Sequence, residues 1–232
     1  MTRLDRLATT GVVAQRCALC LVAWLSLAPL QARAATPLDD LIEPAAGKSA
    51  CFIRVYGADH LRRNPRQKTR SMTVWLKYQP AGPGVPGVAL GLGLEISLRG
   101  DRLPFFAQGG CEWDPHANRD TGGKRLLPTF KKEAGANCLM SAQPDVFESV
   151  SAEEGGFLVL DRGRDNDTVM VYLDESLIMV KRANRAKHLD VWFGVDDRVF
   201  RLHRTDSKDC AAVENAVTER EPTSPPRSPA RR

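Results

Sequence analysis

The sequence of 232 residues predicts an all-β fold, either an antiparallel β-barrel or a β-sandwich of about 8 to 10 short strands. Three observations predict it: hydrophobic alternation in one long segment, short apolar segments about ten residues apart, and four cysteines that remain after a removable leader. With 43% hydrophobic and 26% charged residues, the composition is globular. It excludes disordered, collagenous and multi-spanning membrane classes.

The alternation is clearest in Val88–Arg99. Apolar residues occupy every second position, whereas the opposite face carries Gly91 and Gly93 among small or polar residues. The pattern predicts a strand with one buried face, formed by Leu90, Leu92, Leu94, Ile96 and Leu98. The two glycines suit a bend, a bulge or another backbone segment that lies close.

The remaining apolar segments are shorter, and residues typical of turns separate them. The strands they predict are Cys51–Tyr56, Met72–Tyr78, Leu103–Gln108, Cys138–Ser141, Phe157–Asp161, Thr168–Leu173, Leu177–Val180, Leu189–Phe193 and Val199–Arg204. Helical patterns are confined to one turn at Thr36 and Pro37 and another that begins at Asp59. Asp196 and Asp197 lie in a predicted tight turn, where one carboxylate is expected to accept backbone N–H bonds.

Both ends of the chain differ from the part between them. Residues 1–34 have the features of a secretory signal peptide: a basic start, the uncharged stretch Cys17–Leu30 and a small-x-small pattern that ends at Ala34. We expect residues 35–47 to form an N-terminal linker and residues 48–210 a single β-rich domain. Residues 211–232 are rich in Pro and Arg and predict a disordered tail. The mature protein is therefore expected in the periplasm or outside the cell, without a transmembrane anchor.

Four cysteines remain after the leader, and an even number in an exported chain predicts a disulfide framework. Spacing alone permits three pairings. We favour Cys51 with Cys210, which would join the first and last strands, and Cys111 with Cys138. A metal site is not expected, because the four cysteines form no Cys-x-x-Cys pair and no His stands at ligand spacing from one.

The apparent basicity of the chain comes mostly from the leader. The leader contains four Arg and one Asp, so the 33 Lys+Arg and 28 Asp+Glu of the whole chain become 29 and 27 in the mature protein. A general affinity for nucleic acid is therefore not expected. The charge that remains is unevenly distributed along the chain, with eight basic and two acidic residues between positions 51 and 100.

Most of that excess lies in one segment, residues 60–70, which we call the basic segment. Its cations are His60, Arg62, Arg63, Arg66, Lys68 and Arg70. One interpretation is an anion-binding loop, because guanidinium groups form paired hydrogen bonds with phosphate and carboxylate. The other is an ordinary solvated connection between strands. The segment has no aromatic residue on which a base could stack, so nucleic acid is the least supported anion.

Two further segments carry groups of acidic residues. Asp161, Asp165, Asn166 and Asp167 could supply oxygen ligands to calcium, but the same residues are typical of a hairpin turn, and two interleaved arginines argue against a cation site. Around Cys111, the residues Glu112, Asp114 and His116 could serve as an acid–base group. The alternative is that Trp113 and Cys111 anchor this region to the core.

These observations favour an exported, disulfide-stabilised binding module without catalytic residues or cofactor, for an anionic envelope component or a small ligand. One alternative is an inhibitor of an exogenous hydrolase, a lysozyme or a protease, that acts through a rigid loop. A second is a hydrolase that uses Glu112, Asp114 and His116; the sequence contains none of the common catalytic motifs. An internal cavity would favour carriage of a small ligand, and a filled core would favour surface recognition.

Overall fold

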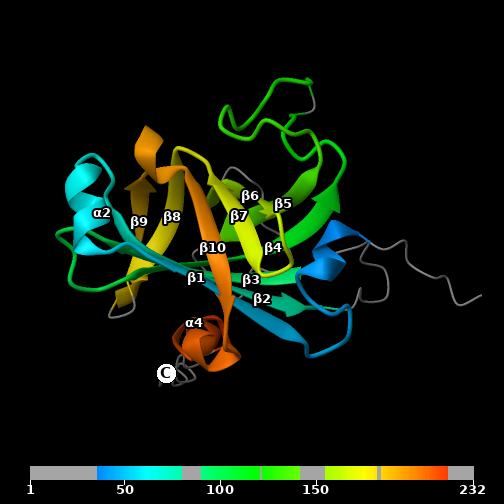
Figure 1. Ribbon diagram of the computed structural model, residues 1–232, viewed down its shortest axis with the longest axis horizontal. Helices are drawn as coiled ribbons and strands as arrows, with labels where there is room; N and C mark the ends of the chain where they lie inside the picture. The colour runs from blue at the N-terminus through cyan, green and yellow to red at the C-terminus, as the bar shows by residue number, and fades with distance from the viewer. Residues whose placement is uncertain (1–35, 80–89, 121, 142–154, 182–183, 219–232) are drawn as a thin grey trace, which may run out of the picture. The chain divides into compact units, whose positions relative to one another are not determined.

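The computed structural model describes residues 36–79, 90–120, 122–141, 155–181 and 184–218. These residues form ten antiparallel strands and a few short helices (Figure 1). The strands are β1 Ser49–Val55, β2 Thr69–Tyr78, β3 Leu90–Leu98, β4 Phe105–Asp114, β5 Gly135–Ser141, β6 Phe157–Arg162, β7 Thr168–Leu173, β8 Ser176–Lys181, β9 Asn184–Trp192 and β10 Val199–Thr205. The helices are η1 Pro37–Asp40, α2 Ala58–Arg63, η2 Val195–Asp197, η3 Ser207–Cys210 and α4 Ala211–Thr218. Each predicted strand corresponds to one of the ten, and both predicted helical turns form.

Eight of the strands close into an antiparallel barrel, which decides between the two predicted architectures. The order is β3-β2-β1-β10-β7-β6-β5-β4, and β3 also pairs with β4 to close the ring. Strand β4 carries two partners on one edge: Phe105 and Phe106 pair with β8, whereas Gln108–Asp114 pair with β5. The β8–β9 hairpin therefore extends the sheet where β5 leaves β4.

The barrel interior is filled by its own side chains. In β3, Leu90, Leu92, Leu94 and Ile96 are each at most 1% exposed, which confirms the predicted inward face. All the other strands add buried apolar residues to the same cluster, including Phe52 of β1 and Phe200 of β10. An eight-stranded barrel has an interior just wide enough for side chains. The structure therefore favours recognition at the surface over carriage of a ligand inside.

One end of the barrel is covered by the segment that the sequence assigns to a linker. Leu38, Leu41 and Ile42, in and just after η1, are at most 5% exposed and join the main core. Arg204 of β10 donates a hydrogen bond to the carbonyl oxygen of Leu41 at 2.5 Å. This part of the predicted linker is thus part of the domain, because its apolar residues close an otherwise open barrel end. Helix α2 lies at the opposite end (Figure 1).

The predicted disordered tail is wrong for its first eight residues. Residues 211–218 form α4, which packs on the outside of β2, β3 and β4 through Val213, 1% exposed, and Val217. The helix lies over Gly93, where an added Cβ would come within 2.7 Å of Val213 and 2.9 Å of Val217. This is the close approach that the bare face of the long strand predicts. Residues 219–232 lie outside the described residues, as does the predicted signal peptide.

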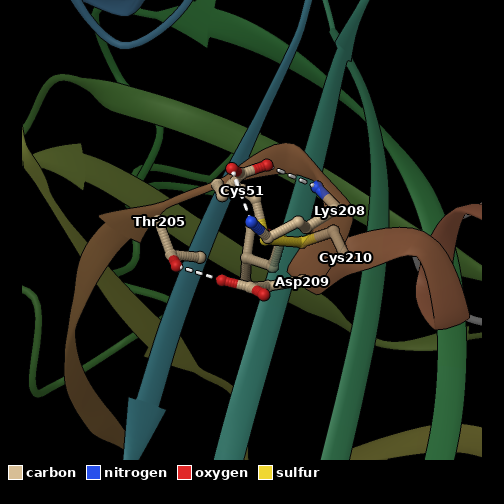
Figure 2. Close-up of a disulfide and its surroundings, with 7 residues drawn as sticks. Cys51, Thr205, Lys208, Asp209 and Cys210 are labelled. Carbon is tan, nitrogen blue, oxygen red and sulfur yellow. Dashed lines mark hydrogen bonds and ion pairs between the residues drawn. A yellow bond between two sulfur atoms is a disulfide. The ribbon is translucent and has the colours of Figure 1, made fainter.

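Both disulfides form with the predicted pairing. Cys51 and Cys210 join β1 to η3, 159 residues apart in sequence, where Thr205 and Lys208 bond to neighbouring carboxylates (Figure 2). Cys111 and Cys138 lie directly opposite each other on β4 and β5, 27 residues apart. Two disulfides indicate an oxidising, extracytoplasmic compartment. No helix in the described part of the chain has the length and apolar character that crossing a bilayer requires.

Candidate functional site

The basic segment folds as most of α2, the connection to β2 and the first two residues of β2. Helix α2 is held by Leu61, 8% exposed, on its inner face. Arg99, just after β3, donates hydrogen bonds to the carbonyl oxygens of Leu61 and Pro65, the latter at 3.4 Å. The guanidinium of Arg99 thus bonds to the last turn of α2 and to the connection that follows it.

Two acidic residues of the turn before β10 anchor the basic segment. The carboxylate of Asp197, 0% exposed, accepts the backbone N–H of Lys68 at 2.7 Å and of Thr69 at 2.9 Å. Its neighbour Asp196 pairs with Arg66 at 3.0 Å. The sequence predicts a carboxylate in this turn that accepts backbone N–H bonds. The donors, however, lie 128 and 129 residues earlier, so the two aspartates join distant segments.

Only some of the predicted cations remain available to a ligand. Arg62 pairs with Asp59, and Arg66 with Asp196. Arg70 donates to the carbonyl oxygen of Asp101 at 3.3 Å. Within the described part of the chain, the side chains of Arg63 and Lys68 have no ion-pair partner. The basic segment is therefore an anchored connection with partly neutralised charge.

A shallow depression of about 320 Å³ adjoins this segment on the barrel wall. Its lining residues are Arg54, Tyr56, Met170, Val199, Arg201 and His203. It lies where β1 stops pairing with β10, because the ladder between them ends at Ile53 opposite His203. We call it the basic depression, since three of its six lining residues are Arg or His and none is acidic.

Tyr56 connects the basic depression to the basic segment. Its ring stacks on the imidazole of His60 at 4.7 Å between centroids, and the guanidinium of Arg54 lies 5.0 Å from the centroid of the same ring. His60 in turn lies 2.9 Å from the amide oxygen of Gln67. Burial raises the pKa of the Tyr56 hydroxyl, although Arg54 opposes the shift. The hydroxyl therefore stays neutral at physiological pH and can donate a hydrogen bond.

The chemistry of the basic depression suits an oxyanion. Arg54 comes from β1, and Arg201 and His203 project from alternate positions of β10, with Met170 of β7 opposite Arg201 in the ladder. A guanidinium group can donate two parallel hydrogen bonds to the oxygens of a phosphate, sulfate or carboxylate group. The methionine offers an apolar contact to the part of the ligand that carries the anion. Such a site could hold a charged group of a larger molecule, with no catalytic step implied.

Reasoning from the sequence missed the residues of this depression. Arg54 and Arg201 are 147 positions apart in the sequence, so no local motif joins them. The one available signal was the period of two in Val199, Arg201 and His203, which places all three on one face of the last strand. That β1 lies beside β10 was implied by the favoured disulfide between Cys51 and Cys210.

The acidic segment 161–167 forms a turn in which each carboxylate has a partner. Asp161 pairs with Lys132 at 2.6 Å. Asp165 accepts the hydroxyl of Thr168 at 2.8 Å, and Asp167 lies 3.5 Å from Arg204. In the described ranges, no group of three or more His, Cys, Asp or Glu could hold a metal ion.

The three residues considered for acid–base chemistry lie at the end of β4 and in the turn after it. Glu112 and His116 are exposed, and the carboxylate of Asp114 accepts the backbone N–H of His116 at 2.7 Å. That bond shapes the turn after β4. Trp113 packs against the main core, as the alternative interpretation of this region predicts.

No protein-family model, curated protein or solved structure matches the chain. Function is therefore inferred from the geometry of the basic depression and the segments around it.

Proposed function

We propose that the protein is a periplasmic or secreted, non-catalytic binding module that holds an oxyanionic group of an envelope component in the basic depression. The observation that carries the proposal is a depression that contains Arg54, Arg201 and His203 without a lining carboxylate. The filled barrel interior supports surface recognition, and the two disulfides support an exported location. The predicted leader supports the same location.

The ligand chemistry has two sources in a cell envelope, an anionic polymer and an anionic lipid head group. Both present phosphate or carboxylate oxygens to the same guanidinium groups. The basic segment contributes long-range attraction through Arg63 and Lys68, which should weaken as salt is added. Binding by the depression should be less sensitive to salt, because Arg54 is half-buried.

The test measures binding of the oxidised full-length chain to a soluble polyuronate, to polyphosphate and to vesicles of phosphatidylglycerol, with neutral phosphatidylcholine vesicles as reference. The double variant Arg54→Gln with Arg201→Gln should weaken binding of the preferred probe by about 30-fold or more, since each charged hydrogen bond contributes about 1.5 kcal/mol or more. Arg102→Gln removes an exposed arginine from the connection between β3 and β4, which contributes no residue to the depression, and should bind as the unmodified protein does.

Two outcomes would overturn the proposal: no binding to any of the three anionic probes, or equal binding by the double variant. The triple variant Arg62→Ser, Arg63→Ser and Arg66→Ser addresses the basic segment separately. It should lower affinity by a few-fold at low salt and have little effect at high salt. Unchanged binding at low salt would remove the basic segment from the site.

A further inference from the structure

Strand β9 lies at the end of the sheet that the barrel does not close. The eight strands of the ring have a neighbour on each side, and β8 and β9 continue the sheet away from them. Among the described strands, β9 pairs with β8 alone. Three of its residues that follow one another on one face, His188, Asp190 and Trp192, are exposed, and Trp192 is 64% exposed. The outer edge of β9 is therefore open to solvent.

The backbone along this edge has donors and acceptors that β8 does not use. Phe193, just after β9, donates its N–H to the carbonyl oxygen of Glu175, just before β8, at 2.8 Å. Backbone groups point to alternate sides along a strand, so every second residue before Phe193 also faces β8. The groups that point away from β8 belong to His188, Asp190 and Trp192. Such a row of backbone groups is a template for another strand.

The side chains on this edge restrict which strand can pair with it. Asp190 stands in the middle of the exposed row, and its carboxylate has no ion-pair partner among the described residues. A strand that pairs here must place a cation or a hydrogen-bond donor opposite that carboxylate, because another carboxylate would repel it. His188 lies two positions away on the same face and is also exposed. Its imidazole is a donor of the required kind.

A second copy of the same strand supplies that donor in one register. If two β9 strands run antiparallel with Leu189 opposite Leu189 of the second copy, each His188 faces Asp190 of the other chain. These two facing pairs also exchange about four backbone hydrogen bonds. Trp192 then lies diagonally across from His188 of the second copy, within reach of an aromatic side chain. A register centred on Asp190 would instead place two carboxylates against each other.

We propose that the protein forms a symmetric dimer through β9, with the two strands antiparallel and centred on Leu189. A two-fold axis brings the same residues of each chain together, so the strand has to complement only itself. The half-buried Leu189 side chains pack against each other on the face of the sheet that contacts the main core. Residues 219–232 of the same chain are a poor alternative occupant, because their four prolines cannot complete a ladder. The inference does not depend on the basic depression.

Disulfide trapping tests the register. In the dimer, the two Leu189 residues form a pair without direct backbone bonds between them, and the Cα atoms of such a pair lie about 4.5 Å apart. That separation permits a disulfide. Leu189→Cys in the oxidised full-length chain should therefore give a covalent dimer on a non-reducing gel. The matched control is Lys187→Cys, an exposed residue of the same strand, whose two copies would be roughly 14 Å apart and should cross-link about tenfold less.

Exchange of the facing residues tests the assigned pairs. Sedimentation of the oxidised full-length chain should show a monomer–dimer equilibrium with a dissociation constant at or below about 100 µM. His188→Asp places carboxylates opposite carboxylates in both pairs and should raise the constant about tenfold or more. The double variant His188→Asp with Asp190→His reverses each pair and should restore dimerisation. An effect of either residue on the folding of one chain would not be rescued in this way.

Three outcomes would overturn the proposal. The first is a chain that remains monomeric up to about 500 µM, which would leave the free edge to a strand of another protein. The second is cross-linking of Lys187→Cys to the same extent as Leu189→Cys, which would contradict the register. The third is a double variant that dimerises no better than His188→Asp, which would contradict the pairing of His188 with Asp190.

Discussion

The basic segment and the connection between β4 and β5, residues 115–134, which we call the excursion, both carry several cations, but they are held in different ways. The basic segment depends on Asp196 and Asp197, which reach it from a turn about 130 residues later in the chain. The excursion is held by bonds among its own residues, by packing on the neighbouring strand β6 and by a disulfide that spans 27 positions. The sequence shows where the cationic side chains are. Hydrogen bonds to the backbone of each segment decide whether those side chains lie on a fixed surface. Four changes should separate the two regions.

Removal of each disulfide should have the largest effects. In the loop-entropy model, the Cys51–Cys210 bond contributes about 5 kcal/mol to the free energy of unfolding and the Cys111–Cys138 bond about 4 kcal/mol. We expect Cys51→Ala with Cys210→Ala to lower stability throughout the barrel. The pair Cys111→Ala with Cys138→Ala should loosen the excursion first. Urea unfolding gives the totals, and hydrogen exchange locates the loss; equal protection of the excursion in both variants would contradict this division.

Asp197→Ala should loosen the basic segment and leave the excursion unchanged. It removes a buried carboxylate that accepts two backbone N–H bonds, so we expect a loss of about 3 kcal/mol in the free energy of unfolding. Asp196→Ala removes a solvent-exposed ion pair and should cost less than about 1 kcal/mol. Chemical denaturation of both variants measures the difference. Similar losses would show that the buried carboxylate is not the anchor.

Asn118→Ala should loosen the excursion and leave the basic segment unchanged. The change leaves buried backbone groups of Leu127 and Phe130 without their side-chain partner, at a cost of about 2 kcal/mol. Because the excursion packs outside the barrel, the loss should be confined to residues 115–134 in a hydrogen-exchange map. Exchange that also accelerates in the basic segment would mean that the two regions are coupled.

Lowering the pH should have the smallest of the four effects, and it should act on the excursion. Hydrogen bonds from Arg119 lower the pKa of Glu133 below its ordinary value. The stabilisation is therefore fully present above the ordinary glutamate pKa and is lost as the pH falls through the lower, folded value. NMR chemical shifts of Arg119 and Gly123 should stay constant from pH 7 to 5 and change only under more acidic conditions. In Arg119→Gln, the carboxyl of Glu133 should titrate at a higher pH.

Local patterns predicted the elements of the fold well. Alternation located β3 and the face that it buries, and each of the ten strands corresponds to an apolar segment in the sequence. The predicted domain, residues 48–210, is too short at both ends, because Leu38 and Val213 are also buried against it. There a few apolar residues on a short helix gain stability only from the barrel against which they pack, and a composition argument that treats each segment alone cannot include that contribution.

The candidate site was predictable only in part. The basic segment was visible as a run of charges, whereas Arg54 and Arg201 meet through strand pairing between the two ends of the domain. Strand order is set by contacts that are distant in sequence. The anchoring role of Asp197 toward Lys68 was hidden for the same reason.

The bond between Cys51 and Cys210 also determines how the protein would respond to mechanical force. It joins positions 159 residues apart, so a pull on the two termini is carried by a covalent ring that contains the whole barrel. Without it, that stretch of chain could extend to a length of about 540 Å. With it, tension on the ends reaches η1 and α4, which lie outside the ring, before it reaches the strands between Cys51 and Cys210.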